Sequence, residues 1–314
     1  MRSFLRHIPT KYRGVRLWAV FFLLAYGCGN PNAGKIPNET PTSGTINISV
    51  DESFKPVIDS QIKVFESSYP DVRIIPHYKA EVECLRDLIN DSTRMVIVTR
   101  GLSTQERKFY SDSLHYIPVY DLLAYDAIAV VVNNKVKDSI FTISDIRAML
   151  NGSAKKDWQV VMDGVSATST VRYAIDSILL GGSLGPKVMA AKSSQEVVSY
   201  VADHENAIGF VGVSWVGDQD DPAMTSFLNN VRIASVQCVS CLGETYLKPY
   251  QANIALKRYP FVRGLYYILK ENFRGVGNNF VNFMEYERGQ LIFQRAYLWP
   301  ARMSFEIRDT QISN

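Results

Sequence analysis

Histidine and cysteine are scarce in this chain, and several common catalytic motifs are missing. Four histidines occur in 314 residues, and His77, His115 and His204 are scattered without the spacing of metal ligands. There is no phosphate loop of the G-x-x-x-x-G-K type, and Gly212–Val216 lacks the second glycine of the G-x-S-x-G hydrolase motif. We therefore predict no catalytic residues, no cofactor and no metal site.

A long apolar run is missing as well. The run Leu17–Ala25 is too short to cross a bilayer, which takes about 20 apolar residues. It follows a segment that carries five Lys and Arg and no acid, and it precedes Ala25-Tyr26-Gly27-Cys28. A charged start, an apolar centre and small residues are typical of a secretory signal, which we predict over residues 1–27.

The cysteine that follows these small residues resembles that of a bacterial lipobox, which becomes the lipid-modified first residue of the mature protein. The resemblance implies that Cys28 is lipidated and that the protein is anchored to a membrane of the bacterial cell envelope. Gly29–Asn32 carries no charge cluster, which favours the periplasmic side. The alternative is an ordinary secretory signal with an incidental cysteine.

The composition of residues 28–44 predicts a tether. The chain without the signal is nearly neutral. Gly, Pro, Asn, Ser and Thr dominate this segment, a composition that cannot form a core. Without residues 1–27 the chain has 29 Lys and Arg against 31 Asp and Glu. No basic patch therefore indicates a nucleic-acid partner.

The cysteines other than Cys28 cannot form a complete disulfide framework, because three remain. Cys238 and Cys241 form a single C-x-x-C pair, and Cys84 stands alone. The pair is compatible with a local disulfide in an oxidising compartment, with two inert thiols, or with a redox motif. A zinc site would need a second pair.

Periodicity predicts alternating strands and helices, and therefore an α/β fold. The first block reads as strand, helix, strand, helix, strand over 45–50, 56–69, 72–77, 83–90 and 95–99. The second block has strands and helices at 127–132, 142–152, 158–161, 169–180, 194–204 and 208–211. In the tail we expect a strand at 252–256 and helices at 261–273 and 278–288.

Four segments resemble a known family, the extracytoplasmic phosphate-binding proteins of ABC importers, which have the type II periplasmic binding protein fold. They are DAIAVVVN at 126–133, TISDIRAMLNG at 142–152 followed by Trp158, AIGFV at 207–211, and Gly289-Gln290 followed by Tyr297 and Trp299-Pro300. Their order and spacing match those of the family over residues 45–302.

The resemblance implies a monomer with two lobes, each a mostly parallel sheet flanked by helices, joined by a hinge of two crossing strands. The lobes would be 45–125 plus 250–314 and 126–249. The ligand would be inorganic phosphate or another small oxyanion bound between them, and the partners would be the membrane subunits of an ABC importer.

The family's anion-binding segments map onto three stretches of this chain. The first contains Ser53 and Phe54, the second Thr99 and Arg100, and the third Thr168, Ser169 and Thr170. Helix N-termini, hydroxyls and an arginine are the groups that such proteins offer to an anion. Each stretch also has a simpler interpretation, because Ser53 and the third stretch could merely cap helices and Arg100 could face solvent.

The site departs from the family in two ways. Gly164 stands where the family has an arginine, and four acids accompany the site: Asp51, Glu52, Glu81 and Glu83. Acids repel an anion. A second hypothesis is therefore a degenerate binding fold that acts as a sensor or accessory component of an envelope complex without phosphate transport.

Overall fold

The computed structural model describes residues 39–90, 92–164, 168–217 and 229–303. The predicted signal, Cys28 and the other residues of the tether up to residue 38 lie outside these residues. None of the described helices is both long and apolar enough to span a membrane.

Three parallel strands open the fold, as the first block predicts. β1 (Gly44–Asp51) lies between β2 (Val72–Lys79) and β3 (Thr93–Val98). The connections contain α2 (Lys55–Ser68) and α3 (Glu81–Asp87). A short 3-10 turn, η2 (Glu52–Phe54), joins β1 to α2 and holds Ser53 and Phe54 at the end of the strand.

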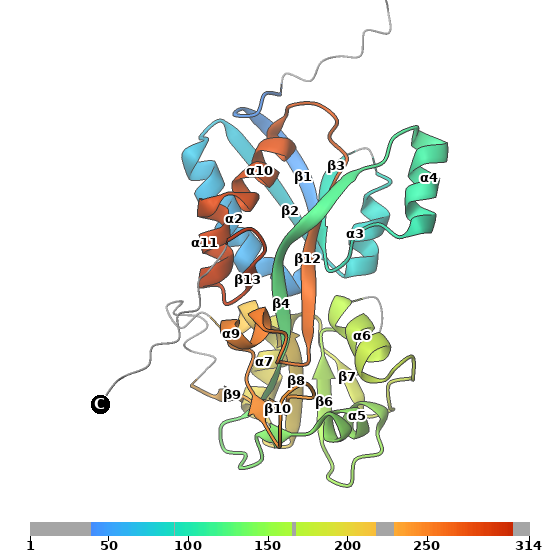
Figure 1. Cartoon of the computed structure of the whole chain (residues 1–314), viewed down its shortest axis with the longest axis vertical. Helices are drawn as coiled ribbons and strands as arrows, with labels where there is room; N and C mark the ends of the chain where they lie inside the picture. The colour runs from blue at the N-terminus through green and yellow to red at the C-terminus, as the bar shows by residue number, and fades with distance from the viewer. Residues whose placement is uncertain (1–38, 91, 165–167, 218–228, 304–314) are drawn as a thin grey trace, which may run out of the picture. The chain divides into compact units, whose positions relative to one another are not determined.

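One long strand, β4 (Val119–Asn133), belongs to two parts of the sheet (Figure 1). Its first residues pair antiparallel with β12 (Val262–Leu269), and the pairing passes to β8 (Ala207–Gly212) at Ile128. The first part of the sheet has the order β2-β1-β3-β12-β4, and the second continues as β4-β8-β6-β7. The sequence predicted only the apolar second half of β4.

The second part of the sheet contains β6 (Gln159–Met162) and β7 (Val188–Ala190), while β9 (Val231–Ile233) pairs with β4. Its helices are α5 (Ile143–Asn151), α6 (Ser169–Tyr173) with the π-helical turn η3 (Ala174–Ile178), and α7 (Ser194–Asp203). A separate small sheet joins β5 (Ile140–Phe141), β10 (Ser235–Gln237) and β11 (Tyr246–Leu247). The short 3-10 turn η4 (Val213–Trp215) follows β8 directly.

The helices α10 (Val276–Glu285) and α11 (Glu287–Arg295) pack with α2 beside the first part of the sheet (Figure 1). Their fully buried rings include Phe65, Phe280 and Phe293, which belong to the main hydrophobic core. β13 (Trp299–Pro300) then pairs with β4. The strand β12 of the same tail lies between β3 and β4 in the first part of the sheet.

Two predictions for the tail are wrong. Residues 261–273 were expected to form a helix but contain the strand β12, and 252–256 were expected to form a strand but lie in α9 (Gln251–Ala255) and its end. A short apolar run fits either period, and Gly264 with its β-branched and aromatic neighbours suits a strand better than a helix. The helix α4 (Thr104–Leu114) was not predicted.

Local sequence signals define both ends of α5. Thr142 and Asp145 form a reciprocal capping box at its start, and Gly152 ends it with a left-handed φ of 80°. Cys238 and Cys241 form a disulfide, which decides between the three interpretations of that pair. Cys84 is a buried free thiol.

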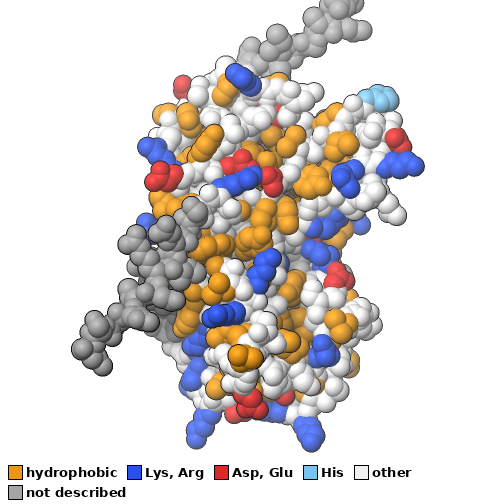
Figure 2. All heavy atoms as spheres, in the orientation of Figure 1, with side chains coloured by type: hydrophobic (Ala, Val, Ile, Leu, Met, Phe, Trp, Pro, Cys, Tyr) orange, Lys and Arg blue, Asp and Glu red, His pale blue; other side chains and the backbone are white. Residues whose placement is uncertain are grey.

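On the face shown in Figure 2, Lys and Arg side chains are spread over many elements and are interleaved with Asp and Glu.

Candidate functional site

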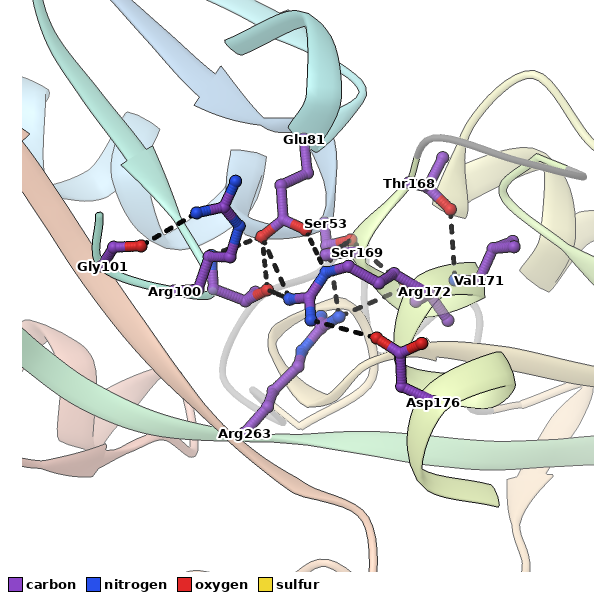
Figure 3. Close-up of polar contacts among 12 residues, drawn as sticks. Ser53, Glu81, Arg100, Gly101, Thr168, Ser169, Val171, Arg172, Asp176 and Arg263 are labelled. Carbon is purple, nitrogen blue, oxygen red and sulfur yellow. Dashed lines mark hydrogen bonds and ion pairs between the residues drawn. The ribbon is translucent and has the colours of Figure 1, made fainter. Parts of the chain in front are cut away.

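A buried arginine that the sequence analysis did not single out organises the site. Arg263 lies on β12 directly opposite Asp126 of β4, and its Nε donates to Asp126 Oδ2 at 2.7 Å. The two side chains are 3% and 0% exposed. Arg263 and Ser169 lie side by side in Figure 3, and Arg263 Nη1 donates to Ser169 Oγ at 2.9 Å. The same nitrogen donates to Thr170 Oγ1 at 3.4 Å, and the guanidinium lies over the Phe54 ring.

Hydroxyl groups from two distant segments meet beside this guanidinium. Ser53 Oγ lies 3.5 Å from Ser169 Oγ and 3.4 Å from Thr170 Oγ1, although Thr170 is 117 residues further along the chain. Three hydroxyls donate to the carboxylate of Asp163, which follows β6: those of Thr168 at 3.0 Å, Thr170 at 3.2 Å and Ser53 at 3.3 Å. We call this group the Arg263 cluster; its members are Asp51, Ser53, Phe54, Asp126, Asp163, Thr168, Ser169, Thr170 and Arg263.

Burial governs the electrostatics of the cluster. The pKa of Asp51 is raised to about 7, chiefly because burial disfavours its charged form, while the positive charge of Arg263 opposes this rise. Burial likewise raises the pKa of Asp126 and of Asp163. Three fully buried carboxyl groups therefore surround one buried guanidinium.

A second polar group lies next to the cluster and joins the same two parts of the sheet (Figure 3). Arg172 of α6 donates from Nε to Glu81 Oε2 at 2.7 Å and from Nη2 to Thr99 Oγ1 at 2.7 Å. Thr99 in turn donates from Oγ1 and from its backbone nitrogen to Glu81. Burial alone would raise the pKa of Glu81, but the contacts with Arg172 and Thr99 lower it.

Glu52 provides a third connection between the two parts. Its carboxylate accepts hydrogen bonds from the backbone nitrogen and the hydroxyl of Ser194, at the first turn of α7. A carboxylate is stabilised at a helix N-terminus by the free N–H groups and the helix dipole. The acids Glu52 and Glu81 thus form intramolecular bonds across the site.

The predicted residues fall into two groups. Ser53, Phe54, Thr168, Ser169 and Thr170 come together in the Arg263 cluster, and Thr99 lies in the neighbouring group. Arg100 does not join them, because its guanidinium binds both oxygens of Glu106 at 2.7 and 2.8 Å. This pairing holds the pKa of Glu106 down at about 2.

Ser53 does not cap the helix α2, which was its simpler interpretation. The side chain of Asp51 accepts from the backbone nitrogen of Ser53, and α2 begins after Phe54 without any side-chain cap. Thr168 does cap α6, by accepting from the backbone nitrogen of Val171. Position 164 is a glycine, and the arginine of the described cluster is Arg263.

The Glu81–Arg172 contact should contribute measurably to stability. Replacing Arg172 with methionine leaves Glu81 buried with only Thr99, so we expect the free energy of unfolding to fall by about 2 kcal/mol. Urea denaturation measures this loss. The control is Lys135→Met, which removes an exposed partner of Glu205 and should cost less than about 1 kcal/mol. Equal losses in both variants would contradict this prediction.

The strand order and the site between two sheet parts define a class: an α/β binding protein with the type II periplasmic binding protein fold. More specifically, the chain belongs to the family described as "PBP superfamily domain", whose model matches residues 36–286. This is a family of binding proteins, which agrees with the prediction that the chain is not an enzyme.

Solved structures share the fold at low sequence identity. A Clostridium perfringens protein described as a phosphate ABC transporter substrate-binding protein, with bound phosphate, is 20% identical with a TM-score of 0.67, covering 82% of this chain and 100% of its own. An ABC-type phosphate transport receptor from Vibrio cholerae is 16% identical with a TM-score of 0.59, covering 81% and 99%.

A regulatory domain also has this fold. The Synechocystis CcmR regulatory domain in complex with 2-PG is 12% identical with a TM-score of 0.52, covering 77% of this chain and 96% of that domain. A comparison with curated protein sequences gave no match. At these identities the structures establish the fold alone.

Proposed function

We propose that this protein is a solute-binding protein for phosphate or a related small oxyanion, which binds in the Arg263 cluster. The observation that carries the proposal is the convergence of donors on one buried point. Ser53, Thr168 and Thr170 direct hydroxyls at it from two segments, and Arg263 places a guanidinium beside it. Such donors are strongest in a buried site of low polarity.

The carboxylate of Asp163 supports this assignment, because it is itself an oxyanion. Its oxygens already accept three hydroxyl hydrogen bonds. A phosphate oxygen in the same position could accept the same donors once they turn from Asp163. The geometry therefore suits a small, multiply charged acceptor better than an apolar ligand.

Entry of a ligand requires the two sides of the cluster to separate, since Ser53 now contacts Asp163 and Thr170 directly. We propose that the two sheet parts act as lobes, 45–125 plus 250–314 and 126–249, which open and close about β4 and its neighbours. Closure around the anion would exclude water and strengthen each polar contact.

The sequence supports a proposed location of the protein in the cell. A signal over residues 1–27 and lipidation of Cys28 would place the protein on a membrane of the cell envelope, facing the periplasm. There it would act as a monomer that delivers its ligand to the membrane subunits of an ABC importer.

Thermal denaturation tests the binding. Protein dialysed free of phosphate should be stabilised by about 2.7 kcal/mol when inorganic phosphate is added at about 100 times its Kd. For a chain of this size we expect the Tm to rise by about 5–10 °C. Thr170→Val should reduce the shift strongly, because it removes one donor and keeps the side-chain shape.

The matched control is Thr104→Val, the same substitution at an exposed position on α4, which should leave the phosphate shift unchanged. Sulfate and other oxyanions in parallel samples define the ligand class. An unchanged Tm with every oxyanion would refute the proposal.

One observation favours a second function, that of a sensor or accessory component without transport. The groups of the site form hydrogen bonds with one another. Asp163 accepts from the hydroxyl donors, while Glu52 and Glu81 connect the two parts of the sheet through Ser194 and Arg172. A domain that no longer exchanges a solute could keep such bonds permanently. It would show no stabilisation by any oxyanion in the experiment above.

A further inference from the structure

The Arg263 cluster contains more acid than base. Asp51, Asp126 and Asp163 are all buried, at 1%, 0% and 8% exposure, and Arg263 is the buried cation that they share. If all three carboxyl groups were ionised, the cluster would carry two uncompensated negative charges. Uncompensated charge in a buried site is costly, and adding an anion would increase the cost.

Three polar atoms in this cluster also lack a partner. Asp51 Oδ2, Asp126 Oδ1 and Arg263 Nη2 are buried and make no hydrogen bond within the described part of the chain. Asp51 Oδ1, by contrast, is fixed by the backbone nitrogen of Ser53 at 2.9 Å. Buried polar atoms are rarely left unpaired, so a free oxygen and a free N–H group in one cluster point to a bound group that would satisfy both.

Charged and titratable groups face Asp51 from several elements. Arg263 approaches from β12, Glu81 and Cys84 from α3, and Asp163 from the end of β6. Asp126 of β4 shares the same guanidinium. Among these neighbours, only Arg263 is a cation, and it already pairs with Asp126.

We propose that Asp51 is a ligand-binding residue that acts as a neutral carboxylic acid, so that the site takes up one proton together with its anion. This inference rests on the proposed oxyanion function. Where Asp51 is ionised before binding, one proton passes from solvent to Asp51 Oδ2 with each anion. The new O–H group then donates to the anion beside Arg263 Nη2, and no other bond is made or broken.

The raised pKa of Asp51, about 7, agrees with this role. Below about pH 7 the proton is present before the anion arrives, whereas above it the proton must be acquired during binding. Binding that requires one proton weakens about tenfold for each pH unit above the pKa. The site therefore works best at neutral and acidic pH.

Calorimetric titration with inorganic phosphate tests the proposal on the whole protein. For the wild type we expect the Kd to rise about tenfold per pH unit above about pH 7. Titrations in two buffers of different ionisation enthalpy should show uptake of about one proton per anion at the alkaline end.

Asp51→Asn separates this role from a structural one. The amide donates a hydrogen bond as the protonated acid would, so this variant should bind phosphate with a Kd that no longer rises above pH 7 and with less proton uptake. The control is Asp112→Asn, the same substitution at an exposed position on α4, which should behave as the wild type.

The outcomes are distinguishable. Phosphate binding without proton uptake, or with uptake that Asp51→Asn leaves unchanged, would overturn the role of Asp51 and leave the oxyanion function standing. Absence of phosphate binding at every pH would overturn both.

Discussion

Replacing Arg263 with methionine is expected to lower the free energy of unfolding by about 3–5 kcal/mol. The substitution leaves Asp126 buried without its partner at 2.7 Å, and it removes the only cation that faces Asp51 and Asp163 in the described cluster. Urea denaturation at neutral pH measures the loss.

Two further measurements identify the cause. The double variant Arg263→Met with Asp126→Leu should recover part of the loss, because it removes one of the unpaired charges. The penalty of Arg263→Met should also shrink as the pH falls, since the buried carboxyl groups then become neutral. A loss below about 1 kcal/mol at neutral pH would show that the cluster does not depend on this cation.

The second large effect is a stability that falls as the pH rises. The pKa of Asp51 is 3.8 as a free group and about 7 in the folded protein, so the folded state binds more protons than the unfolded state between these values. The stabilisation is complete below about pH 4 and is lost progressively up to about pH 7. Its size is about 4 kcal/mol, because one pKa unit is worth about 1.4 kcal/mol.

Denaturation at several values between about pH 5 and pH 8 tests this prediction. Glu106, whose pKa is lowered to about 2, contributes in the opposite sense, but its contribution is lost only below the pKa of the unfolded group, so it does not affect this range. Asp51→Asn should flatten the profile and exceed the wild type in stability near pH 8. A wild type equally stable at both ends would mean that Asp51 stays ionised.

Much of the fold could be predicted because its signals are local. The capping box of Thr142 and Asp145, the glycine that ends α5 and the alternation in β1 each depend on neighbours within a few residues. The strand β12 could not be recognised in the same way. Residues 262–269 are apolar in a pattern that suits both helix and strand, and only pairing with β3 and β4 decides between them.

The residues of the candidate site also differ in whether the sequence alone could reveal them. The hydroxyls of Ser53 and Thr168–Thr170 were found because these stretches match the anion-binding segments of the family that the sequence resembles. Arg263 was missed because its partner Asp126 lies 137 residues away and is brought opposite it only by the strand register. Arg100 was proposed as the cation, but Glu106, which also completes the capping box of α4, pairs with it.

The acids show why charge counting along the sequence was insufficient. Asp51, Glu52 and Glu81 were expected to repel an anion. In the structure Glu52 and Glu81 accept hydrogen bonds from donors in the other part of the sheet, and burial favours the protonated form of Asp51. These partners depend on tertiary structure, which residue types alone do not specify.

Glu39, at the start of the described chain, is attached to the folded domain by two contacts. Its carboxylate pairs with Arg94 at 3.1 Å and accepts from the backbone nitrogen of Val276 at 3.0 Å, which fixes the first turn to the domain. If Cys28 carries the lipid, the connection to Glu39 spans at most about 40 Å when fully extended. The length of this connection would then limit the distance between the domain and the membrane. The domain would be at a high effective concentration towards any partner embedded there.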